Sequence, residues 1–193
     1  MARVAGVRHA DGMRVDRRLL SEAALLLFLA PAMASGCRSQ EGGSVPLGPS
    51  ASSDAWTPEA AGWVTDLSEL LSPEEERNLA ASLQNYRDET GHELAVLIVP
   101  GLRGETIESL SLRVARSWRL GRAGVDDGLL VLLAPGECRI RVEVGDGLTE
   151  AVPDTLAAEV IEREFIPAFR RGDWVGGLDA GLRALMDAGR AAR

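Results

Sequence analysis

The stretch "GLLVLLAPGECRIRVEV" at residues 128–144 decides the fold. Residues 128–134 form a continuous apolar run, which is typical of a β-strand that is buried on both faces. The "PGE" at residues 135–137 is too short for a crossover, and residues 138–144 alternate apolar and charged side chains. The stretch therefore predicts an antiparallel hairpin whose second strand packs one face and leaves the other face wetter.

The same alternation assigns the side chains of residues 138–144 to the two faces of their strand. Cys138 falls on the apolar face, together with an isoleucine and two valines, and is predicted to be a small core residue. Arg139 and Arg141 fall on the wetter face. We expect both arginines to be solvated there, and a contact with an oxyanion is the alternative.

A second buried strand and two helix patterns precede the hairpin. The run "ELAVLIV" at residues 93–99 is uniformly apolar after its first residue, as a central strand would be. Ser72 opens a helix pattern with the signature of a capping box, and Gly91 closes it. A second pattern runs from Thr106 to Gly121 between the two strands, so these strands should lie parallel.

Two more helix patterns follow the hairpin and complete the order of elements. Asp154 begins the first, which we expect to be broken at Pro167, and Asp173 begins the second. The order predicts an α/β fold, in which a small mixed β-sheet is flanked by helices on both faces as a Rossmann-like αβα sandwich.

The amino-terminal third predicts export. Residues 1–36 hold five arginines followed by the apolar run "AALLLFLAPAMA" at residues 23–34, which is typical of a signal peptide. This run is shorter than the roughly 20 residues that span a bilayer. Residues 37–55 are rich in Gly, Ser and Pro and predict a flexible tether, so that residues 56–190 form the folded domain.

Cys37 is the predicted lipidation site. It ends the segment "ASGC" at residues 34–37, which resembles the processing box of bacterial lipoproteins. The protein is then an exported lipoprotein, anchored in a membrane of the bacterial cell envelope, and a secreted or periplasmic protein is the alternative. A disulfide between Cys37 and Cys138 would tie the tether to a strand, and we do not expect one.

The charged residues exclude several classes of function. The net charge is −8 and all 21 basic residues are arginine, so the chain is not expected to bind nucleic acid. Without lysine there is no phosphate-loop NTPase, kinase or Schiff-base site. His92 is the only histidine after the leader, which excludes a zinc site of the HExxH type, and we expect it on the surface.

Two acidic turns are predicted to meet at one edge of the sheet. Folding the hairpin about residues 135–136 places "VDDG" at residues 125–128 beside "EVGDG" at residues 143–147. Asp126, Asp127 and Asp146 would then lie close together, with glycine carbonyl groups exposed between them. Calcium takes about six to eight oxygen ligands in a forgiving geometry. The turns therefore predict a divalent-metal site, for calcium or else magnesium, and three solvated turn residues are the alternative.

The motifs together resemble the TPM domain family over about residues 63–182. The resemblance rests on "VTDLSELLSPEEERNLAASLQNYRDETGHELAVLIVPG", "GVDDGLLVLLAPGECRIRVEVGDGLTE" and "PDTLAAEVIEREFIPAFRRGDW" in this order. It implies an α/β sandwich, divalent-cation binding near the "DDG" turn, and a phosphatase activity in some members. Asp66 of "VTD" matches an acidic position of the family and joins the predicted metal ligands, although an aspartate there can also be a turn former or helix cap.

The turn at residues 145–150 departs from the family. It reads "GDGLTE", where the family usually has G-Y-G-L-E-G, so the aromatic residue is lost and the acid is displaced. We therefore expect an envelope-tethered, cation-binding accessory or maintenance factor for a protein partner. A metal-dependent phosphatase acting on phosphomonoesters is the alternative, and whether the chain is an enzyme stays open.

Overall fold

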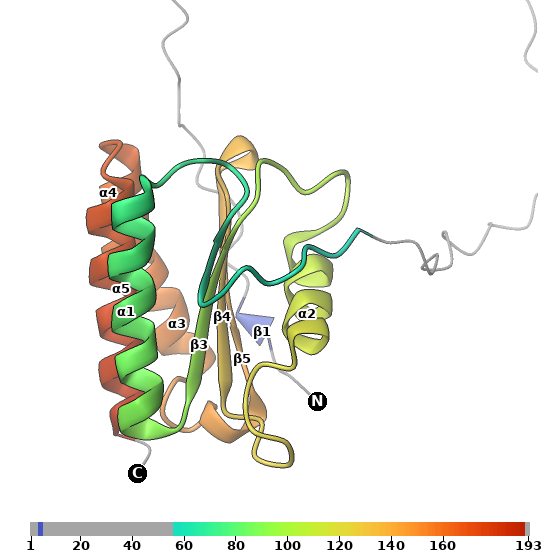
Figure 1. Ribbon diagram of the computed structural model, residues 1–193, viewed down its shortest axis with the longest axis vertical. Coiled ribbons are helices and arrows are strands. Elements are labelled where there is room, and N and C mark those ends of the chain that lie inside the picture. Colours follow the sequence, from blue (N-terminus) through green and yellow to red (C-terminus); the bar gives the residue numbers. More distant parts are fainter. Residues whose placement is uncertain (1–3, 6–55, 192–193) are drawn as a thin grey trace, which may run out of the picture. The chain divides into compact units, whose positions relative to one another are not determined.

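The computed structural model describes residues 4–5 and 56–191 (Figure 1). The predicted tether, Cys37 and nearly all of the predicted signal peptide lie outside these residues. Val4–Ala5 (β1) is the exception, and it pairs antiparallel with the strand that ends the hairpin. Among the described helices, none is long and apolar enough to cross a membrane.

The sheet is mixed, as predicted. Its strands lie in the order β1-β5-β4-β3-β2. Strands β2, β3 and β4 run parallel, and β5 is antiparallel to β4. The strands that follow β1 in the chain are β2 (Val64–Asp66), β3 (Glu93–Ile98), β4 (Gly128–Ala134) and β5 (Arg139–Val144).

Helices cover both faces of this sheet, which confirms the predicted sandwich. In Figure 1, α2 stands alone on one side of the strands, and α1, α3 and α5 lie on the other side. The helices are α1 (Pro73–Thr90), α2 (Ile107–Trp118), α3 (Asp154–Val160), α4 (Ile166–Arg170) and α5 (Trp174–Arg190).

The predicted helix ends are confirmed where local chemistry sets them. The Ser72 side chain accepts from the N–H of Glu75, the Glu75 side chain accepts from the N–H of Ser72, and Gly91 ends α1 in the left-handed conformation. The expected break at Pro167 is wrong. A π-helical turn at Ile161–Phe165 joins α3 to α4, and Pro167 comes just after it, so the irregular turn accommodates the proline within a continuous helical segment.

The main core lies on the face that carries α1, α3 and α5. Residues of β3, β4 and β5 alternate between this face and α2, as the period of a strand requires. Leu129, Val131 and Val142 belong to the main core, and Leu130 and Leu132 are buried outside it, toward α2. Both faces of β4 are therefore dry, as its uniform apolar sequence predicts.

The hairpin is confirmed, but its loop is longer than expected. The last pair of β4 and β5 is Ala134↔Arg139, because Pro135–Glu137 form a 3-10 turn and Cys138 closes it. The Cys138 N–H donates to the Pro135 carbonyl at 3.1 Å, and its backbone is left-handed. Cys138 is therefore exposed on the loop, and its predicted place in the core is wrong.

Candidate functional site

The two acidic turns meet at one end of the sheet, as predicted. The Gly145 N–H donates to the Gly128 carbonyl at 2.8 Å, and the Gly147 N–H donates to the Asp126 carbonyl at 3.1 Å. A Cβ atom on Gly145 would lie 2.0 Å from that Asp126 carbonyl oxygen. Glycine is therefore required at residue 145 by the close approach of the two main chains.

A pocket of about 430 Å³ opens beside this junction, between α2 and the sheet. Asp126 and Asp146 both line it and both are exposed. Arg116 and Arg119 line it from the end of α2, and Glu143 lines it from β5. The pocket therefore joins the predicted acidic turns to a helix that sequence analysis had not connected with them.

Asp127 points away from that pocket and is completely buried. Its Oδ1 accepts from the main-chain N–H of Arg122 at 2.7 Å, and its Oδ2 accepts from Arg122 Nε at 2.7 Å. Arg122 Nη2 lies 2.6 Å from the same Oδ2, while the arginine side chain stays 54% exposed. The carboxylate thus closes the loop before β4 through an ion pair with a partly hydrated guanidinium.

His92 completes the contacts of Asp127, which corrects its predicted place on the surface. The histidine is buried, and its Nδ1 lies 3.1 Å from Asp127 Oδ2. An ionised carboxylate can only accept, so Nδ1 carries the proton. The Gly91 turn at the end of α1 leads straight into β3, which turns the imidazole inward beside the Tyr86 ring.

These contacts decide the protonation of Asp127. Burial by itself would raise the pKa of the carboxyl, because the charged form loses water. The hydrogen bonds from Arg122 and His92, together with the arginine charge, outweigh burial and hold the pKa of Asp127 below its usual value. Asp127 is therefore ionised and saturated with donors at neutral pH.

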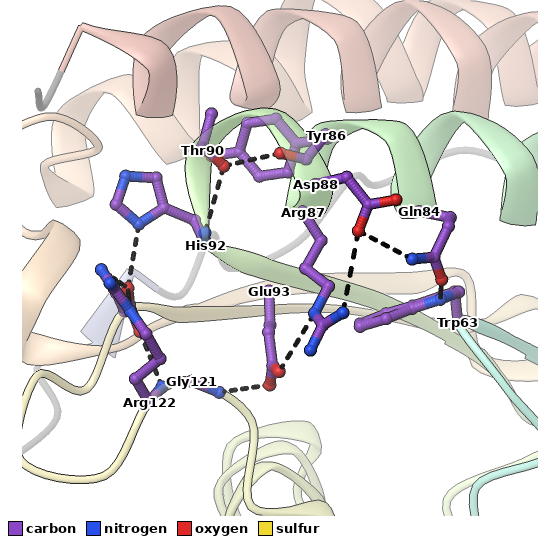
Figure 2. A network of polar contacts seen from close by, with 11 residues as sticks. Trp63, Gln84, Tyr86, Arg87, Asp88, Thr90, His92, Glu93, Gly121 and Arg122 are labelled. Carbon is purple, nitrogen blue, oxygen red and sulfur yellow. Dashed lines mark hydrogen bonds and ion pairs between the residues drawn. The ribbon is translucent and has the colours of Figure 1, made fainter.

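Further polar contacts tie the same end of the sheet to α1 (Figure 2). Glu93 Oε2 accepts from the Gly121 N–H at 2.9 Å, and its Oε1 lies 3.8 Å from Arg87 Nε. The His92 N–H donates to Thr90 Oγ1 at 3.1 Å. The loop before β4 is thus connected to the start of β3, and the start of β3 is connected to the end of α1.

A second buried ion pair lies beneath α2. Arg141 and Glu143 are 1% and 3% exposed, so the predicted solvation of Arg141 is wrong, whereas Arg139 is exposed as expected. Glu143 Oε2 accepts from Arg141 Nε at 2.9 Å and from Ser111 Oγ of α2 at 3.0 Å. Helix α2 covers this face, so the charged residues of β5 are paired rather than hydrated.

Asp66 lies at the opposite end of the sheet from the acidic turns. It pairs with Ile98, the last residue of β3, whereas the Asp127 carbonyl accepts from Glu93, the first. Its side chain accepts main-chain N–H groups of the loop after β2, from Ser68 at 2.8 Å and Leu70 at 2.7 Å, with a third bond from Leu71. The structure therefore gives Asp66 the role of a turn former and does not bring it to Asp126.

The acidic side chains that line the pocket decide which ligands a cation would meet here. Within residues 56–191 no group of three His, Cys, Asp or Glu side chains is placed to hold a metal. Asp126 and Asp146 are the predicted ligands that share the pocket. These oxygens suit a calcium ion that keeps several waters, so cation binding stays a prediction for these two residues.

Sequence analysis missed Arg122, Ser111 and the burial of His92. Two of these partners come from other elements: His92 is 35 residues from Asp127, and Ser111 is 32 residues from Glu143. Arg122 precedes Asp127 by five residues, and the intervening turn residues are the one local signal that the two could close a loop.

Comparison with known proteins identifies the domain. A family model of the TPM domain matches residues 64–188. The fold is similar to the N-terminal domain of a P. gingivalis protein, with 33% identity and a TM-score of 0.61, over 65% of this chain and 80% of that one. No curated protein matches the chain.

Two more distant solved structures share the fold. They are the N-terminal domain of the cg2496 protein from Corynebacterium glutamicum, at 18% identity and a TM-score of 0.52, and the BA42 protein from Bizionia argentinensis, at 16% and 0.58. The matches cover 72% and 66% of this chain and 86% of each of the others.

Proposed function

Because this chain belongs to the TPM domain family, we propose that it is a non-catalytic accessory domain of the bacterial cell envelope, which binds a divalent cation and a protein partner. The pocket at the junction of the two acidic turns carries the proposal. Asp126 and Asp146 would hold the cation there, together with main-chain carbonyls and water. The bound charge would join the two turns and shape the surface that meets the partner.

The buried charges support a binding role over catalysis. Asp127 and Glu143 are the buried carboxylates of the described chain, and each is ion-paired with an arginine. His92 is buried and bonded to Asp127. A general base must reach the proton it abstracts. Asp127 is thus held in structural contacts, as is His92 through its Nδ1 and Glu143 through its Oε2.

Export and anchoring complete the proposal. The basic leader, its apolar run and the tether support an exported protein that Cys37 attaches to a membrane. Growth with labelled fatty acid should label the wild-type chain and leave a Cys37→Ser variant unlabelled. Equal labelling of both would exclude Cys37 as the lipidation site, and a wild-type chain without label would favour a secreted or periplasmic protein.

Calorimetric titration of the purified chain with calcium and with magnesium tests the cation. We expect saturable binding that Asp126→Asn combined with Asp146→Asn removes, because both carboxylates are lost. Glu150→Gln is the matched control, since it removes an exposed acid that does not line the pocket. Binding that persists in the double variant would place the cation elsewhere, and no binding by the wild type would exclude the proposal.

A metal-dependent phosphatase is the second candidate, favoured by Arg116 and Arg119 in the same pocket. Arginines can steady the charge that develops on a phosphoryl group. Release of phosphate from a generic aryl phosphate, measured with and without calcium, magnesium or manganese, separates the two functions. Metal-dependent turnover that Asp126→Asn abolishes would replace the accessory role, and cation binding without turnover would support it.

A further inference from the structure

The pocket beside α2 has walls of opposite charge. Arg116 and Arg119 line it from the last turn of α2, and neither has an ion-pair partner among the described residues. Asp126 and Glu143 line it from the sheet side. Apolar side chains of α2 and β4, among them Leu112, lie between the two walls. Its volume of about 430 Å³ is in the range of small-ligand sites.

Glu143 lines this pocket, and one of its buried carboxylate oxygens has no hydrogen-bond partner. Its side chain is 4% exposed, and Oε1 has no hydrogen-bond partner. The other oxygen, Oε2, already accepts from Ser111 Oγ and from Arg141 Nε, and Arg141 Nη2 lies 2.7 Å from it. A buried acceptor without a partner costs free energy, and a donor that enters the pocket would remove that cost.

We propose that the pocket binds a small zwitterion, with an ammonium group and a carboxylate on an apolar stem, the chemistry of a free amino acid. The ammonium group donates to Glu143 Oε1 on the sheet side. The carboxylate meets Arg116 and Arg119, whose guanidinium groups match it in charge and shape. The stem lies against the apolar side chains between them. The inference adopts the pocket of the proposed function as its site but does not require the cation.

Three matched ligands test the inference on the purified chain. Norleucine carries both charged groups, pentylamine lacks the carboxylate, and hexanoate lacks the amine. In titrations followed by NMR, we expect norleucine to bind about tenfold more tightly than either relative, because each loses a charge-assisted hydrogen bond. The Glu143 carboxyl signal should move with norleucine and with pentylamine, and stay in place with hexanoate.

Two variants assign the ends of the ligand. Arg119→Gln should weaken norleucine toward the affinity of pentylamine, with Arg116 still facing the carboxylate. Glu143→Gln should bring it down to the affinity of hexanoate. Arg163→Gln and Glu150→Gln are the matched controls, because both change exposed charges outside the pocket. Circular dichroism checks the fold of Glu143→Gln, and Arg119→Gln lies on an exposed helix end, so one arm survives if the buried variant unfolds.

The outcomes separate this inference from the proposed function. Equal binding of norleucine and pentylamine would overturn it, as would the absence of binding by all three ligands. Norleucine binding without calcium binding would overturn only the cation role. Calcium binding without norleucine binding would overturn only the inference.

Discussion

Asp127 and Glu143 are both buried carboxylates paired with an arginine, yet they differ in what they leave open. Both oxygens of Asp127 accept hydrogen bonds, and its partner Arg122 remains 54% exposed. Glu143 concentrates its bonds on one oxygen, and its partner Arg141 is 1% exposed. The first network is closed and partly hydrated. The second is dry, lies beside the pocket and leaves one buried acceptor without a partner.

The difference separates stability from binding. An ion pair whose cation keeps its water loses less hydration free energy on folding, so the pair with Arg122 is a net source of stability. A fully dehydrated pair contributes little on balance, because the cost of removing water offsets the attraction. We therefore expect the pair of Arg141 and Glu143 to contribute to binding in the pocket more than to the stability of the fold.

Breaking the closed network should have the largest effect. In Arg122→Gln, Asp127 stays buried without its cation, and we expect the free energy of unfolding to fall by about 3 kcal/mol. Urea denaturation followed by circular dichroism measures the change. Arg119→Gln, which removes an exposed arginine of the neighbouring helix end, should change stability by less than about 0.5 kcal/mol. An Arg122→Gln midpoint equal to that of the wild type would show that the ion pair does not stabilise the fold.

Forcing the acidic turns apart should cost slightly less. In Gly145→Ala the new Cβ would lie 2.0 Å from the Asp126 carbonyl oxygen, and we expect a loss of about 2 to 3 kcal/mol together with weaker calcium binding. Gly172→Ala is the control, because its φ of +78° is strained while no atom lies within 4 Å of the new Cβ. It should lose about 1 kcal/mol and keep calcium binding. Unchanged calcium binding in Gly145→Ala would separate the cation from the junction of the turns.

Removing the charge of Asp127 sharpens the comparison through pH. Asp127→Asn should lower the free energy of unfolding by about 2 kcal/mol at pH 7, because bonds to a charged acceptor become bonds to a neutral one. The pKa of Asp127 is lower in the folded chain than in the unfolded chain, so its contribution is present above the ordinary carboxyl pKa of about 3.9 and is lost as the pH falls below it. Urea midpoints of the two proteins should therefore converge in acid. Parallel curves between pH 7 and pH 3 would contradict the assignment.

Breaking an exposed ion pair should have the smallest effect on the free energy of unfolding. Arg163 Nη1 lies 2.6 Å from Glu159 Oε1 on the helix surface, and both side chains are largely hydrated. Arg163→Gln should change the free energy of unfolding by about 0.5 kcal/mol or less, measured by the same urea titration. A larger loss would mean that distance, and not burial, decides the strength of ion pairs in this domain.

The elements that were predicted well depend on neighbours in sequence. Helix α1 begins at its capping box and ends at Gly91, and both signals lie within one turn of the helix end. The hairpin follows from a short loop between two strand patterns. The approach of the two acidic turns then follows, because antiparallel pairing places the start of β4 beside the end of β5.

The incorrect assignments share a different cause. The alternation in residues 138–144 predicts two faces, but it does not show that a helix covers the second one, which buries Arg141 and Glu143 beneath Ser111. Burial of His92 likewise depends on Asp127, on another strand. The left-handed Cys138 was read as a strand residue because the loop end has no side-chain signal.

By itself, the sequence determined the mixed sheet, its helices and the junction of two acidic turns, because hydrophobic period, caps and loop length act over a few residues. Only the tertiary structure decided which acids at that junction line the pocket. It pairs Asp127 with Arg122 and His92, places Asp66 at the far end of the sheet, and leaves Asp126, Asp146 and Glu143 lining the pocket. Those outcomes depend on burial and on partners from distant segments, which a pattern in one stretch of chain does not encode.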